Sequence, residues 1–185
     1  MQSEIIEKLR SNPFYEQVDL VKNAGNLKDL LLIASAQSSG NKTISAILDS
    51  ALFSNISKIG EEEKEVAERI LYVSAQKQNI SKKNLGRIAR KCIEIVRNEK
   101  ENGNIFWAVE ALDSIAKKDD VGKETLALLS TLKSSGELVK VKLSALANRH
   151  VGESVLKKVM RDPSESEEIR DFAKRQYDLK LALRD

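Results

Sequence analysis

The stretch "VGKETLALLSTLKSSGELVKVKLSALANRH", residues 121–150, decides the fold when it is laid over the thirty residues that follow it, "VGESVLKKVMRDPSESEEIRDFAKRQYDLK", residues 151–180. The two stretches align without a gap and begin with the same Val-Gly pair. Further matching positions are Leu126 with Leu156, Leu129 with Val159, Val139 with Ile169, Lys140 with Arg170, and Leu143 with Ala173. Each stretch is therefore predicted to form a helix, a short turn and a second helix.

The rest of the chain shows the same helical spacing of apolar residues, and no segment has sustained alternation of apolar and polar residues. The residues Asn12 and Pro13 are typical of a helix start, and Gly25 is typical of a helix end. We therefore predict an all-α fold of about ten short antiparallel helices in one domain, residues 1–185. The predicted pairs are 13–38, 43–78, 82–117, 122–149 and 152–183, with an extra helix at 3–10 before them and one long helix expected at 43–55.

Apolar residues every three or four positions also occur in irregular helical bundles, so the periodicity alone does not distinguish an open array of pairs from a closed bundle. Two features favour the array. The last two pairs share one ungapped register, and the predicted turns are too short to cross a bundle. A short amphipathic pair cannot bury its apolar face alone, and stacking such pairs into a superhelix is the solution that repeat proteins use.

The segment "DPSESEEIRDFAKRQY" from Asp162 resembles the turn and second helix of a HEAT repeat, in which an Asp-Pro turn precedes a Val-Arg-x-x-Ala pattern. The resemblance is clearest in the C-terminal half. It implies an α-solenoid, and it assigns to Arg170 and Lys140 the role of tying adjacent repeats together. The Asp-Pro turn occurs only once, because Leu132 and Lys133 occupy the corresponding places in the preceding pair.

The composition limits the class of protein. Basic and acidic residues nearly balance, at 31 against 28, so the overall charge does not demand a polyanionic partner. The N-terminal residues do not resemble a secretion signal, and no apolar run approaches the roughly 18 residues of a membrane span. A single cysteine, Cys92, fits a reducing compartment. We therefore expect a cytoplasmic protein without a membrane association.

The sequence lacks the parts of the common catalytic sites. With one histidine, His150, and one cysteine, Cys92, it cannot supply a zinc cluster or a Ser-His-Asp triad. No glycine-rich phosphate loop is present. We predict no enzyme activity, no metal, no cofactor and no small-molecule substrate. His150 is expected to close a helix, and Cys92 is expected in the core beside Leu85, Ile88 and Ile95.

One constellation rises above this background, in the helix predicted at 82–98. Basic side chains project on one side of this helix, opposite the apolar residues, and Glu94 interrupts them. They are Lys83, Arg87, Arg90 and Arg97, with Lys91 at the flank of this side. Such a face can bind phosphate backbones or an acidic protein segment, although many charged helix faces are simply solvated. A second basic run lies at 133–161.

The sequence therefore predicts an interaction or scaffold module that binds a protein partner through a helical-repeat surface, with a nucleic-acid-binding module that uses the basic helix as the alternative. Charge reversal at Lys140 or Arg170 is expected to lower stability, and reversal at Arg87 or Arg90 is not. A third hypothesis comes from DNA glycosylases built from HEAT-like repeats. Their sites pair an aromatic residue with a carboxylate, and Trp107 with Asp113 is the nearest pair here. The flanking Phe106, Val109 and Leu112 favour a packing role for Trp107.

Overall fold

The computed structural model describes residues 2–11, 17–37, 39–54, 60–98 and 105–183. Over these residues the chain forms α-helices joined by turns, without a β-strand, so the predicted all-α class is confirmed. The predicted helix start at Asn12 and Pro13 lies outside the described residues. The helices are α1 (Gln2–Ser11), α2 (Val18–Lys22), α3 (Leu27–Ser35), α4 (Asn41–Asp49), α5 (Ala51–Ser54), α6 (Glu61–Gln76), α7 (Lys82–Asn98), α8 (Phe106–Lys117), α9 (Lys123–Ser130), α10 (Leu138–Ala147), α11 (Glu153–Met160) and α12 (Glu167–Ala182).

The prediction of one long helix at 43–55 is wrong, because the helix is interrupted at Ser50, between α4 and α5. Ser50 has an extended backbone (φ −65°, ψ 150°), and its hydroxyl donates to the carbonyl of Ile47 at 2.8 Å. A serine side chain that bonds the preceding turn competes with the helical backbone. The apolar periodicity runs through this position, so it did not reveal the break.

The chain divides within α8 into two compact units, Met1–Ala111 (unit 1) and Leu112–Asp185 (unit 2). The sequence did not predict this division, and the prediction of a single domain stays a prediction. Each unit has its own aliphatic core.

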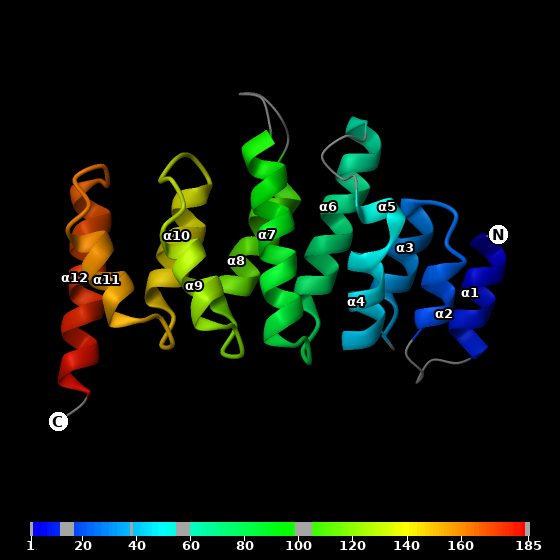
Figure 1. Cartoon of the computed structure of the whole chain (residues 1–185), viewed down its shortest axis with the longest axis horizontal. Coiled ribbons are helices and arrows are strands. Elements are labelled where there is room, and N and C mark those ends of the chain that lie inside the picture. Colours follow the sequence, from blue (N-terminus) through cyan, green and yellow to red (C-terminus); the bar gives the residue numbers. More distant parts are fainter. Residues whose placement is uncertain (1, 12–16, 38, 55–59, 99–104, 184–185) are drawn as a thin grey trace. The chain divides into compact units, whose positions relative to one another are not determined.

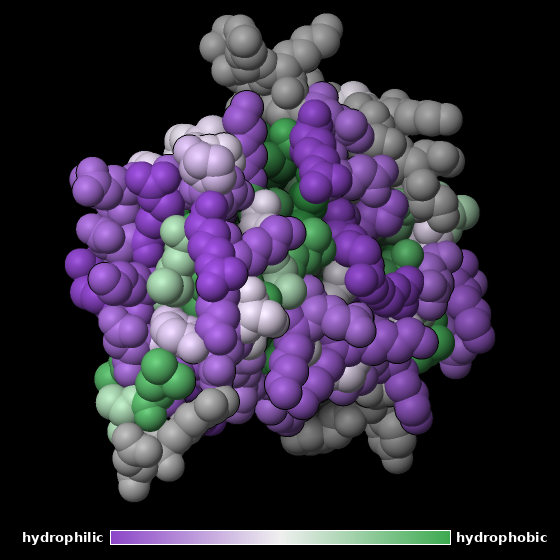
Figure 2. Space-filling view, turned by 60° about the vertical axis from the view of Figure 1, so that its left-hand side comes forward, coloured by the Kyte–Doolittle hydropathy of each residue, from purple (hydrophilic) through white to green (hydrophobic). Residues whose placement is uncertain are grey.

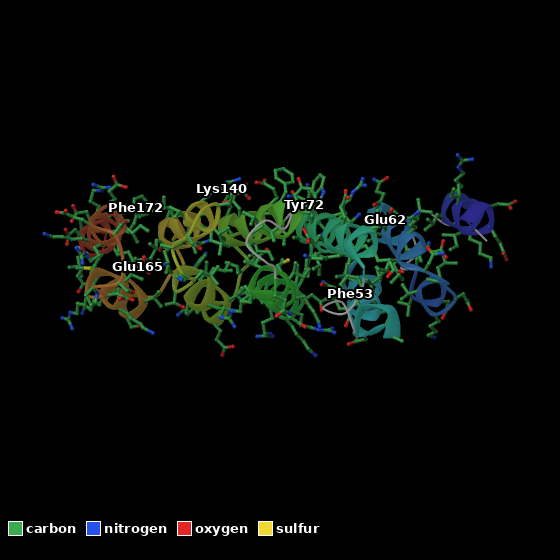
Figure 3. All side chains as sticks on the ribbon, turned by 90° about the horizontal axis from the view of Figure 1, so that it is seen from above. Phe53, Glu62, Tyr72, Lys140, Glu165 and Phe172 are labelled. Atoms are coloured by element: carbon green, nitrogen blue, oxygen red, sulfur yellow. The ribbon has the colours of Figure 1, made fainter. Side chains whose placement is uncertain are left out.

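In unit 1 the helices form two layers (Figures 1 and 3). One layer contains α1, α3 and α6, in which each helix contacts the next, and the other contains α2, α4 and α7. Contacts of α3 with α4 and of α6 with α7 join the layers. The space between them is filled by fully buried aliphatic side chains, among them Leu30, Ile33, Ile44, Ile47, Ile70, Leu71, Leu85 and Ile88. The apolar faces predicted from the periodicity therefore supply this core.

In unit 2 the same arrangement recurs: α9 contacts α11, α10 contacts α12, and each pair is joined internally. Its core includes the buried residues Leu146, Val151, Leu156, Val159, Ile169 and Ala173. Figure 3 shows Lys140 of α10 and Phe172 of α12 on the same side of this unit. The two helical pairs of unit 2 therefore pack side by side.

The internal match between these two pairs holds in the first helices and shifts in the second. Helices α9 and α11 begin thirty residues apart, at Lys123 and Glu153, and end thirty residues apart. In the second helices the buried positions match best at thirty-one residues, so that Leu138 corresponds to Ile169. The second-helix pairings inferred from the ungapped alignment, including Lys140 with Arg170, are therefore shifted by one residue. The turns differ locally: Gly136 has a positive φ of 50°, whereas Ser166 caps α12 through the N–H of Ile169.

Helix α12 exposes hydrophobic side chains at its C-terminal end. Leu179, Leu181 and Leu183 are exposed. A group of hydrophobic side chains is visible at the lower left of Figure 2. Among the described residues, no helix combines the length and the hydrophobicity that crossing a bilayer requires.

Candidate functional site

Helix α7 begins and ends as predicted, at Lys82 and Asn98. The side chains of Leu85, Ile88 and Cys92 are buried, as the sequence predicted. Burial raises the pKa of the Cys92 thiol, and the nearby Glu68 charge raises it further. A thiol with a raised pKa is a poor nucleophile, so Cys92 serves as a small core residue.

Two of the five basic residues predicted as a binding face are paired with acidic residues. Arg87 donates to the Ser45 hydroxyl at 3.1 Å and to the Asp49 carboxylate at 2.5 Å, which joins α7 to α4. Lys91 pairs with Glu94 on its own helix at 3.1 Å. Arg87 therefore has a structural role that the sequence did not indicate.

The other three basic residues, Lys83, Arg90 and Arg97, are exposed, and none forms an ion pair with another described residue. They recur every seven residues, so they lie along one line on α7, about 10.5 Å apart. We call these three residues the cationic stripe. A hollow of about 250 Å³ beside it is lined by Leu48, Arg87, Arg90, Lys91 and Glu94.

The structure changes the expected effect of charge reversal on α7. We expect Arg87→Glu to lower the free energy of unfolding by about 1–2 kcal/mol, because it replaces the contacts to α4 with a repulsion from Asp49. We expect Arg90→Glu, on the exposed side, to change it by at most about 0.5 kcal/mol. Urea unfolding followed by circular dichroism measures both. Equal losses for the two variants would contradict the structural role of Arg87.

Lys140 and Arg170, the two residues expected to tie adjacent repeats together, differ in their contacts. Lys140 of α10 lies 3.4 Å from the carboxylate of Asp113 on α8, so it joins successive second helices. The side chain of Arg170 is partly buried and makes no ion pair with the described residues. Lys180 of α12 instead donates to the carbonyl of Arg149 at 2.5 Å.

The second basic run, 133–161, does not form one basic face. Lys142 is fully buried and forms an ion pair with Glu165, which also accepts a hydrogen bond from Ser134. Arg149 pairs with Asp119 at 3.0 Å. The inward position of Lys142 on α10 removes it from the surface.

The structure reveals a second candidate surface, where α6 meets the start of α8. The residue before α8, Ile105, has no side-chain acceptor for the free N–H groups of the first turn. Glu68 of α6 supplies one, because its carboxylate accepts a hydrogen bond from the N–H of Ala108 at 3.3 Å. Glu68 is only 2% exposed. It therefore holds the first turn of α8, and with it Trp107, against α6.

Three aromatic side chains and one arginine meet there. The Trp107 ring lies 5.1 Å from the Tyr72 ring and 5.1 Å from the Phe106 ring, measured between centroids. The Arg69 guanidinium lies 5.7 Å from the centre of the Trp107 ring, a cation–π distance. We call Arg69, Tyr72, Phe106 and Trp107 the aromatic patch. Figure 3 shows Tyr72 and Glu62 on the α6 layer of unit 1.

The aromatic patch lies at the surface. Phe106 is 47% exposed, Arg69 is exposed, and Tyr72 and Trp107 are partly buried. The chain has only eight aromatic residues, and among those that the structure describes only Phe53 is buried. The core is therefore aliphatic, and three aromatic residues gather outside it.

Asp113, the carboxylate considered with Trp107 for glycosylase chemistry, is buried, and both of its oxygens are bonded to other side chains. It accepts hydrogen bonds from Ser144 and from Lys117, each at 2.6 Å. Burial alone would raise the pKa of Asp113, but the hydrogen bonds from Lys117 and Ser144 and the charges of Lys117 and Lys140 outweigh it and hold that pKa below its usual value. Asp113 is thus a fixed anion that ties α8 to α10.

His150 does not close a helix, because α10 ends at Ala147 and Asn148 caps it. The Asn148 side chain donates to the carbonyls of Ala116 and Lys118 and accepts from the N–H of His150. His150 itself is exposed in the following turn, where its imidazole contacts Arg149. The described residues contain no group of three or more His, Cys, Asp or Glu side chains that could hold a metal ion.

No protein-family model matches the sequence, and neither a curated protein nor a solved structure is significantly similar to it.

Proposed function

We propose that this chain is a HEAT-like helical-repeat module that binds a protein partner through the aromatic patch. The helical repeat provides the scaffold, and Trp107 is the central anchor of the binding surface. The observation that carries the proposal is the gathering of Arg69, Tyr72, Phe106 and Trp107 on one surface of a chain with few aromatic residues.

The contacts between helices support the repeat scaffold. Helices two apart along the chain contact each other in both units, as in stacked pairs: α1 contacts α3 and α2 contacts α4 in unit 1, and α9 contacts α11 and α10 contacts α12 in unit 2. Side chains near the ends of second helices also bond carbonyls at the ends of preceding ones. Lys77 donates to Ala36 at 2.6 Å in unit 1, and Asn148 and Lys180 make similar contacts in unit 2. A donor or a cation at the C-terminal end of a helix satisfies its free carbonyls.

The composition of the aromatic patch supports binding. Trp, Tyr and Arg are the residues most enriched among those that dominate the energy of protein interfaces. The aromatic rings present a large apolar area. The rotamers of these side chains are already restricted by their mutual packing, so little side-chain entropy is lost when a partner covers them. Truncation of such an anchor commonly costs about 2 kcal/mol or more of binding free energy.

The charge around the aromatic patch favours a protein partner over a nucleic acid. Helix α6 carries five glutamates against one lysine and one arginine, a net charge of −3. Glu62 and Glu65 are exposed on this helix. Negative charge on the helix that carries Arg69 and Tyr72 repels the phosphate backbone that single-strand binding requires.

Selection of binders from a displayed random-peptide library tests the proposal. The full chain is immobilised, and the selected peptides are then measured against Trp107→Ala, Tyr72→Ala and the exposed Phe106→Ala. We expect each variant to weaken binding about tenfold or more. Tyr177→Ala is the matched control, because Tyr177 also lies under a cation, Lys157 at 5.0 Å, but belongs to unit 2. Folding of every variant is checked by circular dichroism.

The proposal fails if selected peptides bind all four variants as tightly as they bind the unmodified chain. It also fails if Tyr177→Ala weakens binding while the aromatic-patch variants do not.

A further inference from the structure

We propose that the cationic stripe of α7 docks a second ligand, an acidic amphipathic helix of a protein partner. This surface differs from the aromatic patch, because α7 belongs to the layer of α2 and α4 whereas α6 belongs to the layer of α1 and α3. The inference therefore goes beyond the proposed function and does not depend on it.

The positive charge of α7 favours an acidic partner. Helix α7 carries six basic residues against Glu94, a net charge of +5, while α6 in the other layer carries −3. The ion pairs of Arg87 with Asp49 and of Lys91 with Glu94 use two of these cations internally. The cationic stripe remains exposed to a partner, and its charge is complementary to carboxylates.

The spacing of the cationic stripe matches the spacing of residues on a second α-helix. Successive residues of the stripe, Lys83, Arg90 and Arg97, lie about 10.5 Å apart along α7, because seven residues of an α-helix rise by that length. An acidic residue at every seventh position of a second α-helix has the same spacing, so two such helices side by side bring three pairs of opposite charges together. Flanking charged positions of coiled coils select their partners in this way.

The hollow between α4 and α7 offers an apolar contact beside the cationic stripe. Leu48 provides an apolar surface in it, and Arg87, Arg90, Lys91 and Glu94 surround that surface. Its volume of about 250 Å³ is sufficient for an aliphatic side chain. An amphipathic helix can place a leucine against Leu48 while one of its carboxylates reaches Arg90. A phosphate backbone has no group that would occupy the apolar surface, so this surface favours the acidic amphipathic helix over a nucleic acid.

Fluorescence anisotropy of two labelled synthetic helices tests this inference on the full chain. One peptide carries glutamate at every seventh position beside leucines, and the second has lysine in place of each glutamate. We expect the glutamate peptide to bind, with an affinity that falls as salt rises, and the lysine peptide not to bind. The double variant Arg90→Glu/Arg97→Glu should weaken binding of the glutamate peptide about tenfold or more and should gain binding of the lysine peptide.

The matched control is Lys123→Glu/Lys174→Glu, which changes the net charge equally but alters exposed positions of unit 2. It should bind the glutamate peptide as the unmodified chain does. If the stripe variant fails to fold, Arg90→Ala and Arg97→Ala are measured separately, and each should weaken binding. The inference is overturned if the control variant loses as much affinity as the stripe variant, if the glutamate peptide does not bind, or if a DNA duplex displaces it and binds more tightly.

Discussion

Glu165→Ala should lower the free energy of unfolding by about 3–5 kcal/mol, because it removes the ion-pair partner of the buried Lys142 ammonium. Lys142 is fully buried, and the Glu165 side chain is 8% exposed, so the ion pair is largely shielded from water. Glu165 also accepts a hydrogen bond from Ser134, which fixes the turn between α11 and α12 to the turn before α10. Urea unfolding followed by circular dichroism measures the loss.

Two further variants distinguish a lost ion pair from a general disturbance of unit 2. Glu168→Ala removes an exposed carboxylate from the start of α12 and should change the free energy of unfolding by at most about 1 kcal/mol. Lys142→Met/Glu165→Gln removes both charges and should regain most of the stability that Glu165→Ala loses. A loss below about 1 kcal/mol for Glu165→Ala would show that Lys142 reaches another partner or water.

Asp113→Asn should lower the free energy of unfolding by about 2–3 kcal/mol at neutral pH, because the amide loses its charge-assisted bond to Lys117 and the attraction of Lys140. The loss should depend on pH. The pKa of Asp113 in the folded chain lies below the ordinary carboxyl value of 3.8, so its stabilising contribution is fully present above that value. The contribution disappears as the pH falls through the lowered pKa.

The measurement is urea unfolding of the unmodified chain and of Asp113→Asn between neutral pH and pH 3. The difference in unfolding free energy between them should shrink below about pH 4, where Asp113 takes up a proton in the unfolded state and then in the folded state. A difference that stays constant over this range would contradict the ion-pair role of Asp113.

The sequence predicted the helices well where apolar periodicity and local end signals agree. Helix α7 was predicted at its observed bounds, and the pair predicted at 152–183 extends only one residue beyond the start of α11 and the end of α12. The break at Ser50 escaped prediction because it depends on a local hydrogen bond that leaves the apolar pattern unchanged. The shifted match of α10 and α12 escaped because two turns of different conformation join the helices.

For the candidate sites, too, the sequence did not reveal contacts between residues on different helices. The helical wheel placed the cationic stripe on the exposed side of α7, but it could not show that Arg87 is paired with Asp49 of another helix. The aromatic patch was missed because its residues lie on two helices far apart in the sequence. One signal was available: Tyr72 lies about 100° around its helix from the centre of the apolar face that Ala67, Leu71 and Ala75 form. An aromatic residue outside the apolar face of a helix indicates a contact beyond the core.

Hydrogen–deuterium exchange of the full chain, with and without a peptide selected from the displayed library, tests the central claim most directly. The account predicts that the peptide slows exchange in residues 61–76 and 105–111, which contain the aromatic patch, and leaves α9 and α11 unchanged. Slower exchange confined to other helices, with no change in these two segments, would contradict the claim that the aromatic patch is the binding surface.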